Sequence, residues 1–336
     1  MRISFVGGGT DLRSFYSRYP GRVISTTIDK YVYVTLNRPP LNKKISVRYS
    51  TNEEVDHLSK LKNDRFREAL TDLGFHSGIE LATFTDVSVN AGLGSSSSFS
   101  VGLMKALHLA KGRKLDPRET AEEASRLEIE LVGEPIGKQD QYASAHGGLN
   151  VFQFNKDESV DVFPVHLDYK RRYDFENHTL LFFTGMRRLA SSVLIEQNAN
   201  AEKNFETLKR MADSVPEFEA RLTRGDFKGM GEMLHEGWLM KRTLASNLSN
   251  AIIDDLYATG MKNGVWGGKI LGAGGGGCIM FLAPLEKKEA IRCAMAKTAK
   301  KHSLEDFSEI PVHFVQSGVE VIANNERVIK TTPSVQ

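Results

Sequence analysis

The stretch "VNAGLGSSSSFSVGLMKAL", residues 89–107, decides how this chain is interpreted. Two glycines and four consecutive serines run directly into a segment in which Phe99, Leu103, Leu107 and Ala110 recur at helical spacing. A flexible linker would continue into polar, structureless sequence, whereas this run continues into a helix with one apolar face. We therefore predict a glycine-rich turn that opens a packed helix.

A turn of this kind is suited to binding phosphate. Glycines let the backbone approach an anion and turn its N–H groups toward it, and the first helical turn adds unpaired donors and the positive end of its dipole. Serine hydroxyls can cap the helix, bond phosphate oxygens or reach Mg²⁺. A serine-capped helix after a tight turn explains the same letters, so the local motif leaves both interpretations open.

The overall composition limits the function classes. The chain has 336 residues, enough for about two domains, and its 40% hydrophobic and 26% charged residues are typical of a folded protein. The net charge of +2 provides no broad field for nucleic acid or an anionic membrane, so anion recognition must be local. Two cysteines, Cys278 and Cys293, form neither a metal-ligand spacing nor a disulfide framework, and we expect a cytoplasmic protein. The most apolar late stretch, residues 270–285, is too short and too rich in glycine to span a bilayer.

The order of predicted elements indicates an α+β protein. β-branched and aromatic residues predict strands at 2–6, 22–28, 31–36, 44–50, 79–84, 147–154, 159–165 and 178–185. We expect helices within 52–74 and from Asp116-Pro117 onward, an almost wholly helical region at 191–263, and strands again within 267–284 and 311–323. The change from strand-rich to helix-rich sequence predicts two domains, residues 1–175 and 176–336.

Other phosphate-binding patterns fit poorly. The P-loop pattern does not occur, and "GGKIL" lacks the hydroxyl residue that it requires. Gly272, Gly274 and Gly277 have the spacing of a dinucleotide-binding motif, but the apolar run "CIMFLAP" that follows them predicts a strand where that motif needs a helix. A Rossmann-type oxidoreductase is therefore kept only as the alternative from another class of enzyme.

Three glycine-rich elements, "RISFVGGGTDL" (2–12), "NAGLGSSSS" (90–98) and "KILGAGGGGCIMF" (269–281), together with the segment at 126–152, resemble the GHMP kinase superfamily. The resemblance covers nearly the whole chain. It implies the GHMP kinase fold, with an N-terminal domain of the ribosomal protein S5 domain 2-like type, a C-terminal ferredoxin-like domain and the site between them. "GEPIGKQDQYA" (133–143) and "TGMRRLASSVLIEQ" (184–197) further resemble the branch that phosphorylates D-glycero-D-manno-heptose 7-phosphate at its anomeric hydroxyl.

The resemblance assigns catalytic and metal-binding roles. Asp140 matches the catalytic aspartate that accepts the proton of the sugar hydroxyl, and Glu128 matches a Mg²⁺-binding glutamate. A serine hydroxyl, Ser95 or preferably Ser96, completes the metal ligands. Taken without the resemblance, Asp140 is a helix cap or turn residue and Glu128 an exposed glutamate at a fraying helix end. The ATP-binding residues implied by the second motif are Asn90, Gly92, Leu93, Gly94, Ser95, Ser96 and Ser97.

The first motif implies further contacts. Arg2 stands where galactokinase-like members place a basic residue against the transferred phosphate or the nucleophile. Relatives carry further residues before it, whereas this chain begins at Met1, so we expect a misassigned start or a trimmed first strand. Thr10 and Asp11 match the sugar-contacting end of the motif. Gly8 and Gly9 replace a Glu-His pair of galactokinases, which argues against galactose as the substrate.

A phosphorylated sugar requires a cationic clamp, which arginine suits because its planar fork matches phosphate. Arg187 and Arg188 are the candidates, with Arg188 the better match to the motif and Lys138 as a further cation. The alternative is that the two arginines are an ordinary solvent-exposed basic pair with no ligand. The third motif adds Gly274 and Gly275 to the substrate-binding residues, and Trp238 is expected in the core.

The resemblance therefore predicts an ATP- and Mg²⁺-dependent kinase that makes heptose 1,7-bisphosphate for surface polysaccharide. The expected partners are a small sugar phosphate and ATP, with neither nucleic acid nor membrane, and a homodimer is the expected assembly. Two alternatives stay open. One is another sugar 1-kinase, such as a fucokinase, and the other is a noncatalytic sugar or nucleotide sensor on the same scaffold. Retention of both Asp140 and Glu128 argues against the sensor, which needs neither a base nor a metal ligand.

Overall fold

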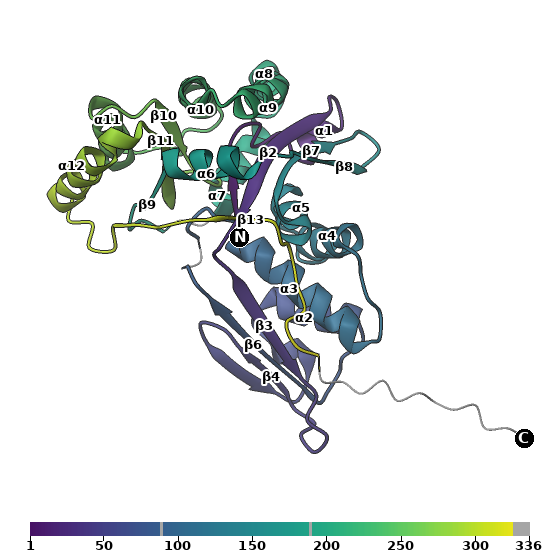
Figure 1. Cartoon of the computed structure of the whole chain (residues 1–336). Helices are drawn as coiled ribbons and strands as arrows, with labels where there is room; N and C mark the ends of the chain where they lie inside the picture. The colour runs from purple at the N-terminus through teal and green to yellow at the C-terminus, as the bar shows by residue number, and fades with distance from the viewer. Residues whose placement is uncertain (88–89, 188–189, 325–336) are drawn as a thin grey trace, which may run out of the picture.

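The computed structural model describes residues 1–87, 90–187 and 190–324, and their strands form three sheets (Figure 1). The first sheet contains the beginning of the chain and has the order β1-β2-β7-β8, with β13 also paired to β2. Its strands are antiparallel and comprise β1 (Arg2–Ser4), β2 (Gly21–Ile28), β7 (Leu149–Phe154), β8 (Val160–Pro164) and β13 (Phe314–Val315).

The second sheet lies at the lower end of the molecule in Figure 1 and has the order β3-β6-β4-β5. Only its β4–β6 pair is parallel. The strands are β3 (Val32–Asn37), β4 (Ile45–Arg48), β5 (Asn52–Val55) and β6 (Ile79–Thr85). Helices α2 to α5 pack between this sheet and the first one: α2 (Asp64–Asp72), α3 (Ser95–Ala110), α4 (Pro117–Arg126) and α5 (Gln139–His146).

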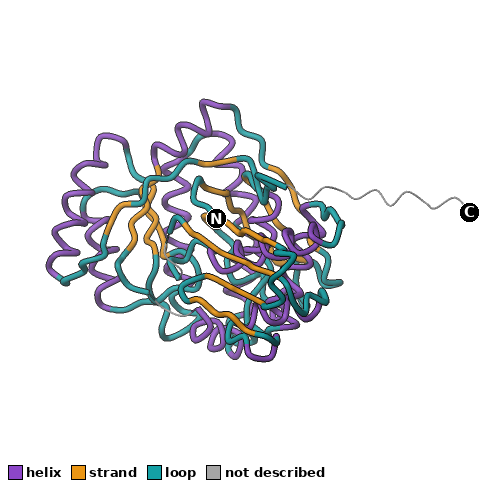
Figure 2. The backbone as a smooth tube through the Cα atoms, turned by 90° about the horizontal axis from the view of Figure 1, so that it is seen from below, coloured by secondary structure: helices purple, strands orange, loops and turns teal. Residues whose placement is uncertain are grey.

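The third sheet belongs to the helix-rich half, with the order β10-β11-β9-β12. Its strands are β9 (Thr179–Phe183), β10 (Gly267–Ile270), β11 (Cys278–Leu282) and β12 (Ser308–Glu309). Figure 2 shows helices on the outside of these strands. The helices of this half are α6 (Tyr169–His178), α7 (Ala190–Ala199), α8 (Phe205–Asp213), α9 (Val215–Arg224), α10 (Phe227–Lys241), α11 (Ala251–Lys262) and α12 (Lys288–Lys301). Short turns are α1 (Arg13–Tyr16), η1 (Leu58–Lys60) and η3 (Leu285–Lys287).

An aromatic cluster joins the first strand to the helix-rich half. Phe5 packs on Phe175 with ring centroids 5.1 Å apart and on Phe218 at 5.6 Å, and Phe314 closes the cluster from the end of the chain. These rings are buried, and aromatic pairs of this geometry stabilise a core beyond their buried area. The turn that follows Phe5 is therefore held at the junction of the two halves.

The structure confirms the α+β class and most predicted elements, with one correction. The helix expected within 52–74 is α2, and residues 52–55 before it form β5, which pairs with β4. The expected strand at 311–323 shortens to β13, which pairs with β2. The glycine-rich loop 271–277 connects the antiparallel strands β10 and β11, so the helix that a dinucleotide motif requires does not follow it.

Candidate active site

Residues 92–97, at the N-terminus of α3, form the turn predicted to bind phosphate, called the phosphate cradle below. Gly94 caps the helix with φ 72°, and Gly92 also has a positive φ of 80°, which a side chain would strain. Gly94 has no side chain that could cap the first turn, which suits N–H groups that bind an anion. Because glycine rather than serine occupies the cap, the serine-capped alternative is wrong. Among the serines that follow, Ser96 is exposed.

Arg2 and Asp140 form a bidentate pair beside this turn. Arg2 Nε donates to Asp140 Oδ1 at 2.7 Å, and Nη2 donates to Oδ2 at 2.6 Å. The third donor, Nη1, bonds the carbonyl oxygen of Gly92 at 2.7 Å. A Cβ atom at Gly94 would lie 3.3 Å from Asp140 Oδ2, so the carboxylate sits directly at the start of α3. Asp140 is the second residue of α5 and does not cap it, which removes the simple capping explanation.

Asp11 is buried and lies close enough to Asp140 for the two carboxylates to interact electrostatically. Its carboxylate accepts hydrogen bonds from the Gly9 N–H at 3.2 Å, the Gln139 N–H at 3.3 Å and Gln139 Nε2 at 3.0 Å. Burial raises the pKa of Asp11, and the nearby charge of Asp140 raises it further. The predicted neighbour Thr10 is fully buried, and its hydroxyl is engaged by backbone groups of Gly7 and Arg22, which gives it a structural role in the turn.

Three buried polar atoms without partners among the described residues surround the turn at 8–11. They are Ser4 Oγ, Gln139 Oε1 and Gln197 Nε2. Ser4 Oγ is near Gly8, and Gln197 Nε2 would be 2.3 Å from a Cβ atom at Gly9. Buried polar atoms are nearly always hydrogen-bonded, so a group of unpaired ones marks a place where a polar ligand belongs. Sequence reasoning missed Gln197, although it ends the quoted segment 184–197.

Glu128 is fully buried, so its interpretation as an exposed glutamate is wrong. It lies in a π-helical turn, η2 (Leu127–Leu131), that continues α4. Its Oε1 accepts from Arg65 Nε at 3.1 Å and from Ser100 Oγ at 2.9 Å, and its Oε2 accepts from Gln141 Nε2. The hydroxyl that contacts the carboxylate is thus Ser100, one helical turn after the predicted Ser96. Gln141 Oε1, beside it, is buried without a partner among the described residues.

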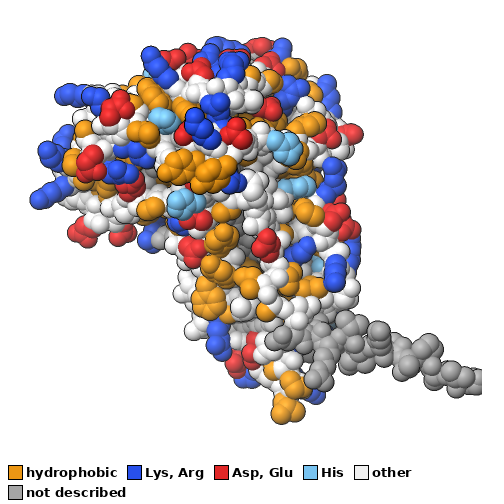
Figure 3. Space-filling view, viewed as in Figure 1, with side chains coloured by type: hydrophobic (Ala, Val, Ile, Leu, Met, Phe, Trp, Pro, Cys, Tyr) orange, Lys and Arg blue, Asp and Glu red, His pale blue; other side chains and the backbone are white. Residues whose placement is uncertain are grey.

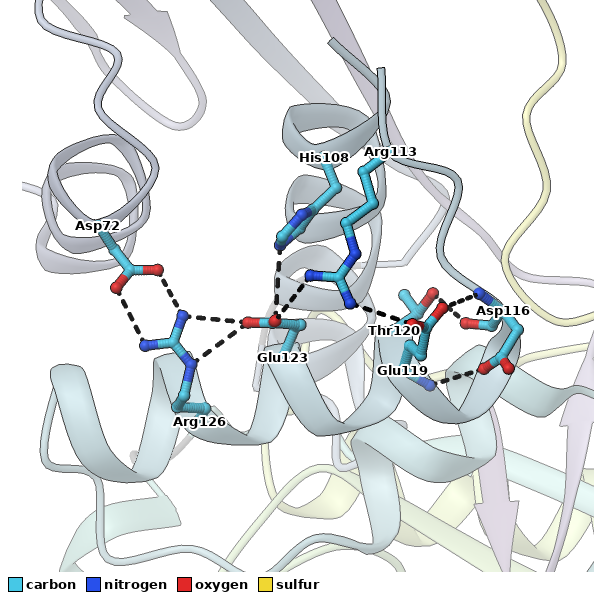
Figure 4. A network of polar contacts seen from close by, with 8 residues as sticks. All are labelled: Asp72, His108, Arg113, Asp116, Glu119, Thr120, Glu123 and Arg126. Atoms are coloured by element: carbon cyan, nitrogen blue, oxygen red, sulfur yellow. Dashed lines mark hydrogen bonds and ion pairs between the residues drawn. The ribbon is translucent and has the colours of Figure 1, made fainter. Parts of the chain in front are cut away.

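A polar network fixes the helix that leads to Glu128 (Figure 4). Arg126 bonds both Glu123 on its own helix and Asp72 of α2. Asp116 and Glu119 form a capping box at the start of α4. His108 and Arg113 reach Glu123 from the end of α3 and from the segment after it, at 3.8 and 3.7 Å. The network ties α2, α3 and α4 together and so fixes the position of Glu128.

The predicted cations are less favourably placed for a clamp. Lys138 Nζ bonds Glu158 Oε2 at 2.8 Å, and Arg187 is exposed and forms an ion pair with Asp306 at 3.6 Å. Arg188 lies outside the described residues. The predicted Gly274 and Gly275 pack on Leu248, whose carbonyl oxygen accepts the Gly275 N–H at 2.8 Å.

The loop 271–277 touches the phosphate cradle. A Cβ atom at Gly92 would lie 2.7 Å from the carbonyl oxygen of Leu271, so the two glycine-rich loops are in backbone contact. The buried ammonium of Lys241, at the end of α10, donates to the carbonyl oxygen of Gly272. This lysine, which the sequence did not single out, therefore links α10 to the cradle.

Among the residues that the structure describes, no helix is long and apolar enough to cross a membrane. These residues also contain no group of three or more His, Cys, Asp or Glu side chains arranged to hold a metal ion. Figure 3 shows basic and acidic side chains interspersed on the visible face. This surface agrees with the small net charge.

Comparison with known proteins gives consistent matches. Residues 60–148 match the GHMP kinases N terminal domain, and residues 214–301 match GHMP kinases C terminal, together just over half of the chain. D-glycero-alpha-D-manno-heptose 7-phosphate kinase of Campylobacter jejuni is 29% identical over 95% of this chain and 96% of its own length. A galactokinase of Pyrococcus furiosus is 27% identical over 88% of this chain and 91% of its own length.

Solved structures share the fold. A D-glycero-D-manno-heptose 1-phosphate kinase from Bacteroides thetaiotaomicron aligns with a TM-score of 0.77 at 23% identity, covering 96% of this chain and 98% of that one. Lactococcus lactis galactokinase complexed with galactose aligns with a TM-score of 0.74 at 18% identity, covering 94% and 92%. At these identities the likeness concerns the fold, and it confirms the two-part architecture expected from the three glycine-rich elements.

Proposed function

Since the chain belongs to the GHMP kinase superfamily and is a phosphotransferase with an alcohol acceptor, we propose that it phosphorylates D-glycero-D-manno-heptose 7-phosphate. The γ-phosphoryl group of ATP passes to the anomeric hydroxyl and gives the 1,7-bisphosphate. The full-length match to the Campylobacter jejuni kinase and the segments 133–143 and 184–197 support this substrate.

The observation that carries the proposal is the Arg2–Asp140 pair at the start of α3. Phosphoryl transfer requires an aligned hydroxyl, stabilised phosphate oxygens and a group that accepts the hydroxyl proton. In the proposed roles, Asp140 accepts that proton, and Arg2 orients the carboxylate and faces the transferred group. The N–H groups of residues 92–97 bind the ATP phosphates. Breaking the O–H bond as the O–P bond forms leaves the proton on Asp140 and ADP as the leaving group.

Mg²⁺ is the metal that kinases of this kind are expected to use, and the oxygen donors suit it. Magnesium prefers carboxylate, hydroxyl and water oxygens. We propose Glu128 and Ser96 as its protein ligands, with the unpaired Gln141 Oε1 as a further oxygen next to Glu128. When bound, the metal would neutralise phosphate charge. Arg65 and Ser100 hold Glu128 in place for this role.

The unpaired atoms around the turn at 8–11 support a polyhydroxyl acceptor. Ser4 Oγ can donate or accept, Gln139 Oε1 accepts and Gln197 Nε2 donates, a mixture that matches sugar hydroxyls. We propose that Gly8, Gly9 and Asp11 complete this surface. We propose Arg188 as the residue that binds the phosphate of the sugar. Further proposed substrate contacts are Arg187, Lys138, Gly274 and Gly275.

A second candidate is a kinase for an unphosphorylated sugar such as fucose. It is favoured by the engagement of Lys138 with Glu158 and of Arg187 with Asp306, since both cations already have acidic partners. The division into residues 1–175 and 176–336, the homodimer and the role in surface polysaccharide stay predictions.

Release of ADP with Mg²⁺-ATP tests the proposal across heptose 7-phosphate, mannose 6-phosphate, free heptose, fucose and galactose. We expect selective turnover of heptose 7-phosphate that is lost in Asp140→Asn and kept in a matched control at the exposed Asp56, Asp56→Asn. Turnover of fucose alone would favour the second candidate. ATP binding without turnover of any sugar would favour the sensor.

A further inference from the structure

A small cavity is lined by residues of the first motif and of the helix-rich half. It measures about 20 Å³ and is bounded by Phe5 and Gly7 from the start of the chain and by Trp238, Lys241 and Lys269 from the helix-rich half. A cavity needs roughly 10–15 Å³ to hold one water molecule, so this one has room for a single small occupant.

Two buried ammonium groups line this cavity. Lys241 is 6% exposed and Lys269 is 7% exposed. Lys241 Nζ donates to the carbonyl oxygen of Gly272, while Lys269 Nζ donates to the carbonyl oxygens of Ser4 at 3.1 Å and Phe5 at 2.7 Å. None of the described residues that line the cavity is an aspartate or glutamate. The nearby charges of Asp11 and Asp140 raise the pKa of Lys241, and the charge of Arg2 lowers it.

A further polar group at the cavity belongs to Trp238, which carries an indole N–H. This side chain is 1% exposed, and its Nε1 has no hydrogen-bond partner among the described residues. An indole nitrogen can only donate, and each ammonium carries three N–H donors, of which carbonyl oxygens take one at Lys241 and two at Lys269. The indole and the two ammonium groups can only donate, and the hydroxyl of Ser214, which also lines the cavity, donates to the carbonyl oxygen of Met211.

We propose that the cavity binds one monatomic monovalent anion, chloride under ordinary conditions, held by Trp238, Lys241 and Lys269. Unpaired charges are costly to bury, and an anion balances them where a neutral water molecule cannot. A monatomic ion also suits the size of the cavity. The anion would hold α10 and β10 against the first strand.

The ionisation behaviour of the lysines agrees with this assignment. Burial lowers the pKa of Lys241 to about 8 and the pKa of Lys269 well below its usual value. The positive charge of Lys241 lowers the pKa of Lys269 further. A bound anion opposes both effects and keeps the ammonium groups protonated.

Thermal unfolding in potassium chloride and in potassium gluconate at equal ionic strength tests the site. Chloride that binds only the folded state should raise Tm by about 2 °C for each tenfold increase above its Kd. The dependence should disappear in Lys269→Met and weaken in Trp238→Phe, which keeps the ring and loses the N–H. Lys297→Met, at an exposed position of α12, is the matched control and should keep it.

Equal Tm values of the unaltered protein in the two salts would overturn the proposal and identify the occupant as water. Diffraction from crystals grown in bromide gives a second result that does not depend on how the variants fold. An anomalous peak beside Trp238 Nε1 supports the anion site, and ordinary water density without such a peak contradicts it.

Discussion

The guanidinium of Arg2 makes two parallel hydrogen bonds to the carboxylate of Asp140, across 138 positions of the chain. The pair joins β1 to α5, and its third hydrogen bond reaches the loop that opens α3. A carboxylate fixed at a helix N-terminus beside an arginine combines a proton acceptor with an anion site. This arrangement explains why three segments that are distant in sequence form one site.

Arg2→Lys should lower kcat by about 100-fold, because one ammonium cannot replace the planar fork that bonds Asp140 twice and Gly92 once. Steady-state kinetics with Mg²⁺-ATP and heptose 7-phosphate measure the effect. Arg113→Lys is a matched control. Arg113 also bonds carboxylates, but it lies in the network of Figure 4 and not beside Asp140, so kcat should stay nearly unchanged. Equal kcat values for the two variants would argue against an oriented carboxylate.

Gly94→Ala should abolish most activity, since its Cβ would press on both Arg2 and Asp140 at 3.3 Å. Gly112→Ala provides the comparison. Its φ is also positive, at 79°, but a Cβ there meets nothing within 4 Å. Both changes should cost about 1–2 kcal/mol of stability, while only the first removes turnover. Retained activity in Gly94→Ala at normal stability would show that close contact at this glycine is not required.

Gln197→Leu should raise KM for the sugar by about tenfold and leave KM for ATP unchanged, because its unpaired amide adjoins Gly9. Gln153→Leu, which alters an amide on β7 that bonds Arg22, is the control and should change neither constant. If KM for ATP rises as much as KM for the sugar, Gln197 acts through general packing.

The lowered pKa of Lys241 predicts how the free energy of unfolding depends on pH in a chloride-free buffer. Its pKa falls from 10.5 in the unfolded chain to about 8 in the folded protein, so the unfolded state binds more protons between these values. The free energy of unfolding should therefore rise from pH 8 to 10.5, by roughly 3 kcal/mol, relative to Lys241→Met. Below pH 8 the difference between the proteins should be flat. Urea unfolding at several pH values measures it, and a flat difference across the whole range would show that the ammonium carries no penalty.

The sequence predicted the local parts of the site better than their partners. The cradle at 92–97 was predictable because glycine spacing and an apolar helix face are local patterns. The pairing of residues 52–55 with β4 was missed, because strand pairing depends on contacts that the local pattern does not contain. Lys241 and Gln197 were missed for the same reason. Gln197 is buried beside Gly9, which lies 188 positions before it, and Lys241 bonds a loop residue 31 positions after it.

The most direct test of the central claim is the ³¹P NMR spectrum of the product formed from Mg²⁺-ATP and heptose 7-phosphate. Transfer to the anomeric hydroxyl predicts a new signal from a phosphate coupled to the anomeric proton, in step with ADP, while the 7-phosphate signal persists. A spectrum in which the sugar phosphate stays unchanged, under conditions where the enzyme phosphorylates another sugar, would contradict it.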